Sequence, residues 1–133
     1  APLLTGAGLY FMANTGTYSL RLLQNGRESI IYESGAQDVT WFDASADGSV
    51  IAFLTTGAPE RELHVLRAGD EKVYYATDLG LSYLQGFALS RSGNEMVVMD
   101  DFGSVIKVSA GADDPRLIAS TSGSPGFITW PCD

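Results

Sequence analysis

The sequence contains one cysteine, Cys132, and one histidine, His64, among its 133 residues. A single cysteine excludes a disulfide within the chain. Catalysis by a serine–histidine or cysteine–histidine pair would have to use His64. Zinc sites usually need several His or Cys ligands, so a histidine-based zinc site is excluded by count. The sequence therefore predicts no catalytic residue, no metal ligands and no cofactor.

Basic residues are also scarce. Eight lysines and arginines stand against 16 acidic residues, which gives a formal net charge of −8. Affinity for nucleic acid is built on Lys and Arg contacts with phosphate, and anionic membranes attract the same side chains. The charge balance argues against both kinds of partner and is typical of a surface that favours solubility.

Long apolar runs are missing, although apolar residues make up 45% of the chain. No run approaches the roughly 18 residues that span a bilayer. The chain starts at Ala1 without a basic n-region and an apolar h-region, so no signal peptide is visible. Either such a segment was removed or the chain is a piece of a longer protein.

The sequence does contain an internal repeat. Ser45-Ala46-Asp47-Gly48 recurs as Ser90-Arg91-Ser92-Gly93, and an apolar run follows each copy. Apolar residues then recur at steps of 43, namely Leu20, Leu63 and Ile106, and likewise Leu22, Val65 and Val108. The residues between them are polar: Arg21, His64 and Lys107. This alternation predicts strands with one apolar face, and it puts His64 on the solvent side of its strand.

Each repeat is expected to form four strands, and the fold class is all-β. In the second repeat the strands are predicted at about Val39–Ala44, Val50–Thr55, Glu62–Arg67 and Lys72–Ala76. Tight turns are expected at Asp47-Gly48 and at Ala68-Gly69-Asp70, since glycine tolerates positive φ. A four-stranded repeat of about 42–45 residues is typical of β-propeller blades.

The stretch from Phe42 to Phe53 resembles the TolB-type propeller repeat, in which a Ser-Pro-Asp-Gly-like turn joins the innermost strand to an Ile-Ala-Phe-like strand. Ala46 replaces the usual proline, and the third repeat keeps only Ser90 and Gly93 of the turn. The resemblance implies six-bladed rings that bind proteins through one face, and also propellers attached to peptidases. No residue role follows from it.

The domain is predicted to span residues 1–133, with blades at about 8–37, 38–80 and 81–125. We expect no strand before Gly8, because Ala1–Ala7 is short and rich in glycine. The missing first strand is predicted at 126–133, where Phe127-Ile128-Thr129-Trp130 matches Val39-Thr40-Trp41.

Three blades cannot close on themselves, since natural rings have at least four. Two copies would make a six-bladed ring, a homodimer in which each C-terminal strand completes the first blade of the other chain. The alternative is that the chain is a fragment of a longer propeller.

One rim of such a ring would be acidic. The loops that share this rim carry acids and aromatics, and they form the candidate binding surface: Glu33, Asp38, Glu60, Asp78, Asp100, Asp101, Tyr83 and Phe102. The surface would suit a basic protein, a basic peptide or a cation, while the plain alternative is a set of solvated turns.

Three functions follow from this architecture. The first is a non-catalytic binding or scaffold propeller. The second is a lid or fragment of a larger propeller-containing hydrolase. The third is a metal-dependent propeller enzyme, for which the first strands supply mainly Asp43 and Asp38.

Overall fold

The computed structural model describes residues 2–14, 18–33, 39–57, 60–110 and 117–122. These residues form three antiparallel sheets of four strands each and no α-helix. One short 3₁₀ turn, η1 (Ala76–Leu79), precedes the third sheet. The predictions of an all-β class and of four strands in each repeat are confirmed.

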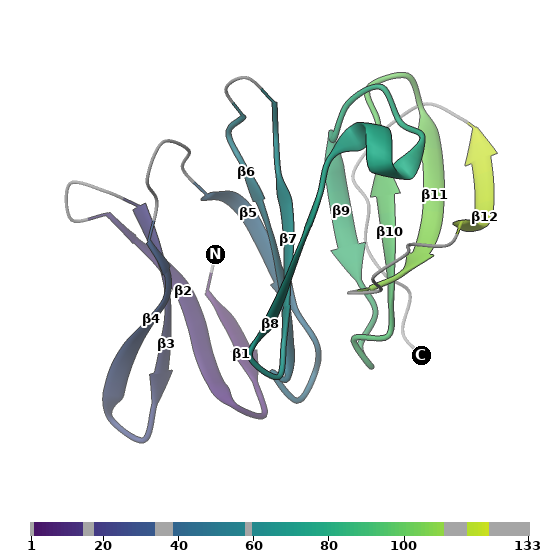
Figure 1. Cartoon of the computed structure of the whole chain (residues 1–133). Helices are drawn as coiled ribbons and strands as arrows, with labels where there is room; N and C mark the ends of the chain where they lie inside the picture. Colours follow the sequence, from purple (N-terminus) through teal and green to yellow (C-terminus); the bar gives the residue numbers. More distant parts are fainter. Residues whose placement is uncertain (1, 15–17, 34–38, 58–59, 111–116, 123–133) are drawn as a thin grey trace.

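The three sheets follow one another in chain order (Figure 1). The first sheet contains β1 (Leu3–Thr5), β2 (Gly8–Asn14), β3 (Tyr18–Gln24) and β4 (Arg27–Glu33). The second contains β5 (Val39–Ala44), β6 (Val50–Thr55), β7 (Leu63–Arg67) and β8 (Asp70–Tyr74). The third contains β9 (Gly86–Leu89), β10 (Glu95–Met99), β11 (Ser104–Ser109) and β12 (Leu117–Ser122).

The prediction that no strand precedes β2 is wrong. β1 pairs with the start of β2, with Leu3 opposite Tyr10. The Thr5 hydroxyl donates to the carbonyl of Gly8 at 3.0 Å and accepts the amide of Ala7 at 3.2 Å. The glycine-rich stretch therefore forms the tight turn that brings β1 onto β2. The C-terminal strand predicted at 126–133 lies outside the described residues.

Two apolar layers hold the sheets together. Residues of the first and second sheets form one layer: Tyr10, Leu20, Val39, Phe42, Ile51 and Phe53. The other layer joins the second and third sheets and includes Leu54, Leu63, Val65, Met96, Val98 and Val108. All six residues of β6 are buried, because its side chains alternate between the two layers. The second sheet is covered on both faces.

Residues that are 43 positions apart point to the same side of their sheets in the first two repeats but not in the third. Leu20 packs toward the second sheet and Leu63 toward the third, so each faces the sheet that follows. Ile106, however, packs in the layer shared with the second sheet and faces backward. His64, which alternates with Leu63, also faces backward, where it stacks on Phe53. The counterpart of His64 in the third sheet is thus the buried Ile106.

The turn between the first two strands is built alike in the second and third sheets. Ser45 and Ser90 are buried, and each hydroxyl accepts a backbone amide five residues on, from Val50 at 3.0 Å and from Glu95 at 3.2 Å. Gly48 has φ +78°, and a Cβ there would lie 2.5 Å from Ala7. The repeated Ser-x-x-Gly sequence is therefore needed for a buried turn that packs on the neighbouring sheet.

These turns also link consecutive sheets. The amide of Gly6 donates to the carbonyl of Ala46, and the amide of Ala46 donates to the carbonyl of Arg91, both at 2.8 Å. Each bond joins the turn after the innermost strand of one sheet to the corresponding turn of the next. A stack of four-stranded sheets joined by one repeated contact fits the arrangement of propeller blades.

The carboxylate of Asp47 organises its turn and makes stability depend on pH. Its Oδ1 atom accepts the Ser49 amide at 3.0 Å, the Ser49 hydroxyl at 2.7 Å and the Ser45 hydroxyl at 2.8 Å. These bonds, led by the Ser49 amide, lower the pKa of Asp47 to about 2. A depressed folded-state pKa stabilises the fold above the unfolded value and loses that effect as the pH falls.

We therefore expect Asp47→Ala to lower the free energy of unfolding at neutral pH. The difference from wild type should shrink as the pH falls from about 4 toward about 2, because the wild-type carboxylate is then protonated. Urea unfolding across this range measures it. A difference that stays constant over the whole range would contradict the role of the charge.

Candidate functional site

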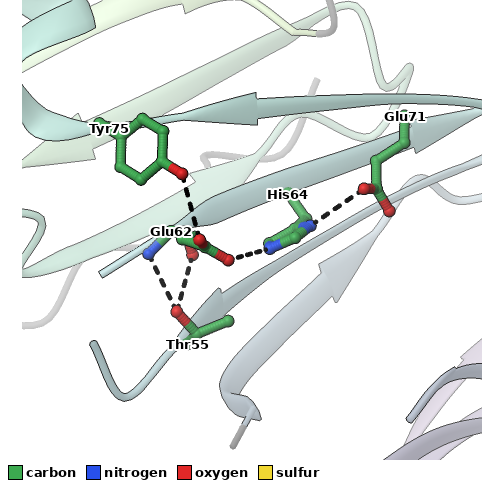
Figure 2. A network of polar contacts seen from close by, with 5 residues as sticks. All are labelled: Thr55, Glu62, His64, Glu71 and Tyr75. Atoms are coloured by element: carbon green, nitrogen blue, oxygen red, sulfur yellow. Dashed lines mark hydrogen bonds and ion pairs between the residues drawn. The ribbon is translucent and has the colours of Figure 1, made fainter. Parts of the chain in front are cut away.

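His64 lies at the centre of a network of polar contacts (Figure 2). Its Nε2 atom is 2.9 Å from Oε1 of Glu62, and its Nδ1 atom is 3.5 Å from Oε1 of Glu71. Glu62 directly precedes β7, His64 lies within β7, and Glu71 comes from the paired strand β8. The imidazole therefore lies between two carboxylates that neighbouring strands position.

The Glu62 side chain and backbone are held from two sides. The Tyr75 hydroxyl donates to Oε2 of Glu62 at 3.2 Å, and Thr55 exchanges backbone and side-chain hydrogen bonds with the Glu62 backbone. The bond to Glu62 raises the pKa of Tyr75. Burial, followed by the charges of Glu62 and Glu71, raises the pKa of Tyr32 across the layer. These tyrosines therefore stay protonated and serve as hydrogen-bonding and packing groups.

The prediction that His64 lies on the solvent side of its strand is wrong. The His64 side chain is 7% exposed, its ring stacks on Phe53 with 4.6 Å between centroids, and Tyr32 of β4 lies 5.4 Å away. The alternation suggested solvent because β7 also buries Leu63 and Val65 on its other face. In a sheet packed between two others, both faces are interior, and the polar residue needs partners.

The geometry of His64 suits a structural hydrogen bond better than catalysis. The short distance to Glu62 fits an Nε2–H donor, whereas Nδ1 makes no hydrogen bond and only faces Glu71. Thr55 is buried, and its hydroxyl is engaged with the Glu62 backbone. Among the described residues no group of three or more His, Cys, Asp or Glu side chains could hold a metal ion. Through His64, the network lies on the face of the second sheet that packs against Tyr32 of the first sheet.

Asp43, the inward-facing acid considered for a metal-dependent enzyme, is engaged by backbone groups. It accepts the amide of Leu89 in β9 at 2.8 Å and the amide of Ala44 at 2.9 Å. Burial raises the pKa of Asp43, and the two hydrogen bonds oppose that effect. This carboxylate joins the innermost strands of the second and third sheets. Asp38, its suggested partner, lies outside the described residues.

The upper rim is the end of the sheets that carries η1, the β6–β7 connection and the β10–β11 turn (Figure 1). Ser82 brings two predicted acids together there, donating to Asp100 at 3.3 Å and to Asp101 at 3.1 Å. Arg61 donates to the carbonyl of Leu84 at 3.1 Å and lies 5.1 Å from the ring of Tyr83. Ser82 could not be recognised from the sequence, because a lone serine in a loop carries no signal of its own.

Two of the predicted binding acids serve the local backbone. Asp100 is buried and accepts the amides of Phe102 at 3.0 Å and Ser104 at 2.9 Å. Burial acts to raise the pKa of Asp100, but these hydrogen bonds outweigh it and the net pKa is lowered. Asp78 accepts the amide of Tyr75 at 2.8 Å and caps η1. Both are turn-forming residues.

The remaining rim residues are accessible. Glu33, Glu60 and Asp101 are exposed, Phe102 is 79% exposed, and Tyr83 is partly exposed beside Arg61. Asp78 is exposed as well, so the structure leaves four acids and two aromatics of the predicted binding surface open to solvent.

The outer face of the first sheet is a second accessible feature, and it is apolar apart from the ion pair between Arg21 and Glu28, the cross-strand partner of Leu23. Cross-strand partners share a face, so Leu4, Leu9 and Leu23 form one row, and Phe11, Arg21 and Ile30 form the next. Leu4 is 79% exposed and Ile30 is 52% exposed. We call these six residues the outer face. The opposite face of the same sheet packs on the second sheet through Tyr10 and Leu20.

Comparison with protein families and with curated proteins gives no match. No protein-family profile matches the chain. No curated protein is significantly similar to it. Within the described residues, no helix has the length and apolar character that crossing a membrane requires.

Proposed function

We propose that the chain supplies three blades of a TolB-like β-propeller, closes a six-bladed ring with a second copy, and acts in that ring as a non-catalytic binding scaffold. One observation carries the proposal. The second sheet is covered on both faces, whereas the outer face of the first sheet exposes apolar side chains such as Leu4 and Ile30. Contiguous exposed apolar surface is typical of interaction sites, and a further blade would cover it.

The contacts between sheets support a ring. The bond from Gly6 to Ala46 is repeated from Ala46 to Arg91, so one backbone contact joins the first sheet to the second and the second to the third. A repeated contact of this kind forms a ring where the rotation between neighbours closes. Two copies of three blades give six, the number that the TolB-type resemblance implies.

The upper rim is the proposed binding surface of the scaffold. Exposed Glu60 and Asp101 lie with Phe102 and Tyr83 on loops of a sheet framework, and exposed Glu33 ends β4; loops of this kind are where binding residues concentrate. The chain carries a net charge of −8, and a ring of two copies would present each rim acid twice. Such a field speeds encounter with a basic protein or peptide.

The test of the ring is the mass of the protein in solution. Light scattering at micromolar concentration is expected to give twice the chain mass of 14.2 kDa. Ile30→Glu should weaken the dimer by about 100-fold or more, because the interface would then bury a second carboxylate beside Arg21, which already pairs with Glu28. Ile30 is half exposed in the single chain, so the variant is expected to remain folded.

Phe102→Glu is the matched control, since it places the same charge at an exposed apolar residue on the rim. This variant should keep the wild-type dimer. A wild-type chain that stays a folded monomer at micromolar concentration would contradict the ring. Equal weakening by the two substitutions would show that charge alone, not the outer face, controls association.

A further inference from the structure

The innermost strand of the first sheet is only half as long as its counterpart. β1 pairs with Gly8, Leu9 and Tyr10, whereas β2 continues to Asn14. In the second sheet, β5 pairs along β6 as far as Thr55. Among the described residues, no strand pairs with Phe11–Asn14 on this inner edge.

An apolar hollow of about 320 Å³ lies beside this stretch of β2. Leu3 and Met12 line it from the first sheet together with Pro2, which precedes β1, and β5 lines it with Thr40, Trp41, Phe42 and Asp43. Trp41 is 44% exposed. The edge of β2 thus offers free strand positions next to a space large enough for an aromatic side chain.

The register of the second sheet indicates which residue would reach the hollow. Trp41 pairs with Leu54, and Leu54 pairs with Leu63. In the first sheet, Met12 pairs with Leu20. Leu20 faces the following sheet, as Leu63 does in the second sheet. Met12 is therefore the equivalent of Leu54. A strand that continued the pattern would therefore put a residue equivalent to Trp41 opposite Met12.

The chain contains such a residue. Thr40-Trp41 recurs as Thr129-Trp130, preceded by the apolar pair Phe127-Ile128. We infer that residues 127–130 of a second copy add to the inner edge of β2 opposite Met12–Asn14, beyond Pro2, with Trp130 in the hollow beside Met12. This inference rests on the proposed two-chain ring. It revises the predicted strand exchange, because β1 already fills part of the innermost position.

Chain length argues for a second copy and against the same chain. The connection from β4 to β5 has five residues and leads from the outer strand of one sheet to the inner strand of the next. Four residues, 123–126, separate Ser122 from Phe127, which suits the same step beyond the third sheet. Return to β2 of the same chain would cross two sheet spacings of about 10 Å and three strand spacings of about 4.8 Å. That path is longer than the roughly 18 Å that the connection can span.

A designed disulfide tests this strand. Extending the register puts Ile128 opposite Ala13, as Val39 is opposite Thr55. The variant Ala13→Cys/Ile128→Cys, with Cys132→Ser to remove the native thiol, should form a disulfide between chains on mild oxidation, since cross-strand Cα distances fall in the range that disulfides accept. The expected result is a shift of most of the protein from the 14.2 kDa band to twice that mass on a non-reducing gel.

Leu9→Cys/Ile128→Cys/Cys132→Ser is the control, because Leu9 already pairs with Leu4 of β1. It should stay at the single-chain mass. Trp130→Ala in the otherwise native chain should weaken the dimer by about 10-fold or more, as expected for loss of a buried aromatic anchor.

The outcomes separate the two proposals. A dimer by light scattering that forms no interchain disulfide overturns the strand and leaves the ring standing. A disulfide within one chain overturns the second copy as the source of the segment. A monomer overturns the ring and the strand together.

Discussion

Phe53→Ala is expected to lower the free energy of unfolding by about 3–5 kcal/mol, the usual loss for a buried phenylalanine. Phe53 is fully buried, and its ring centroid lies 4.5 Å from that of Tyr32 and 4.6 Å from that of His64. Truncation would leave a cavity where the first sheet meets the second. The loss is a large part of the roughly 5–15 kcal/mol that stabilises a typical domain.

Chemical unfolding at one fixed protein concentration measures this change, since association would otherwise alter the apparent stability. Phe102→Ala is the matched control, because the same atoms are removed from a side chain that is 79% exposed. Its effect should stay within about 0.5 kcal/mol. Similar losses in the two variants would mean that Phe53 does not anchor the layer.

The first two strands of the second sheet could be predicted from local signals alone, whereas the fourth, predicted at about Lys72–Ala76, runs from Asp70 to Tyr74. The bounds Val39–Ala44 and Val50–Thr55 are those that the sequence predicted. Apolar alternation defines such strands, and the intervening Ser-x-x-Gly turn fixes where they end. Ser45 and Gly48 are needed by the turn itself, so the sequence carries the information within a few residues.

β1 could not be predicted in the same way, because its three residues have no pattern long enough to read. Leu3–Thr5 becomes a strand only by pairing with β2, and a hydrogen bond from Gly6 to Ala46 of the next sheet helps to fix the turn. The information therefore lies in contacts with other elements. The same applies to the face of Ile106, which the spacing of 43 residues misassigned because the third strand of that repeat is shifted by one position.

The rim acids show a different limit of prediction from the sequence. Asp100 is buried and Asp78 is exposed, yet each accepts backbone amides of its own turn. Aspartate side chains commonly accept the backbone amide two residues on, as Asp100 does from Phe102. Glu60 and Asp101 are exposed, and their part in binding stays a prediction.

His64 departs furthest from its prediction, and its substitution gives the clearest measure of the buried face. His64→Ala is expected to cost about 1–3 kcal/mol of unfolding free energy, since it removes a stacked ring and leaves the half-buried Glu62 carboxylate without its 2.9 Å partner. A residue on the solvent side of a strand would change stability by less than about 0.5 kcal/mol. Urea unfolding separates these outcomes.

His64→Phe divides the effect into packing and hydrogen bonding. Phenylalanine keeps a ring against Phe53 and Tyr32 but offers no donor to Glu62, so its loss should be smaller than that of alanine, about 1 kcal/mol. Glu62 retains the Tyr75 hydroxyl as a partner in both variants. If alanine and phenylalanine were equally destabilising, the hydrogen bond to Glu62 would account for the whole effect. If neither substitution changed stability, His64 would have to face solvent. That result would contradict its buried position on the face of the second sheet that packs against the first.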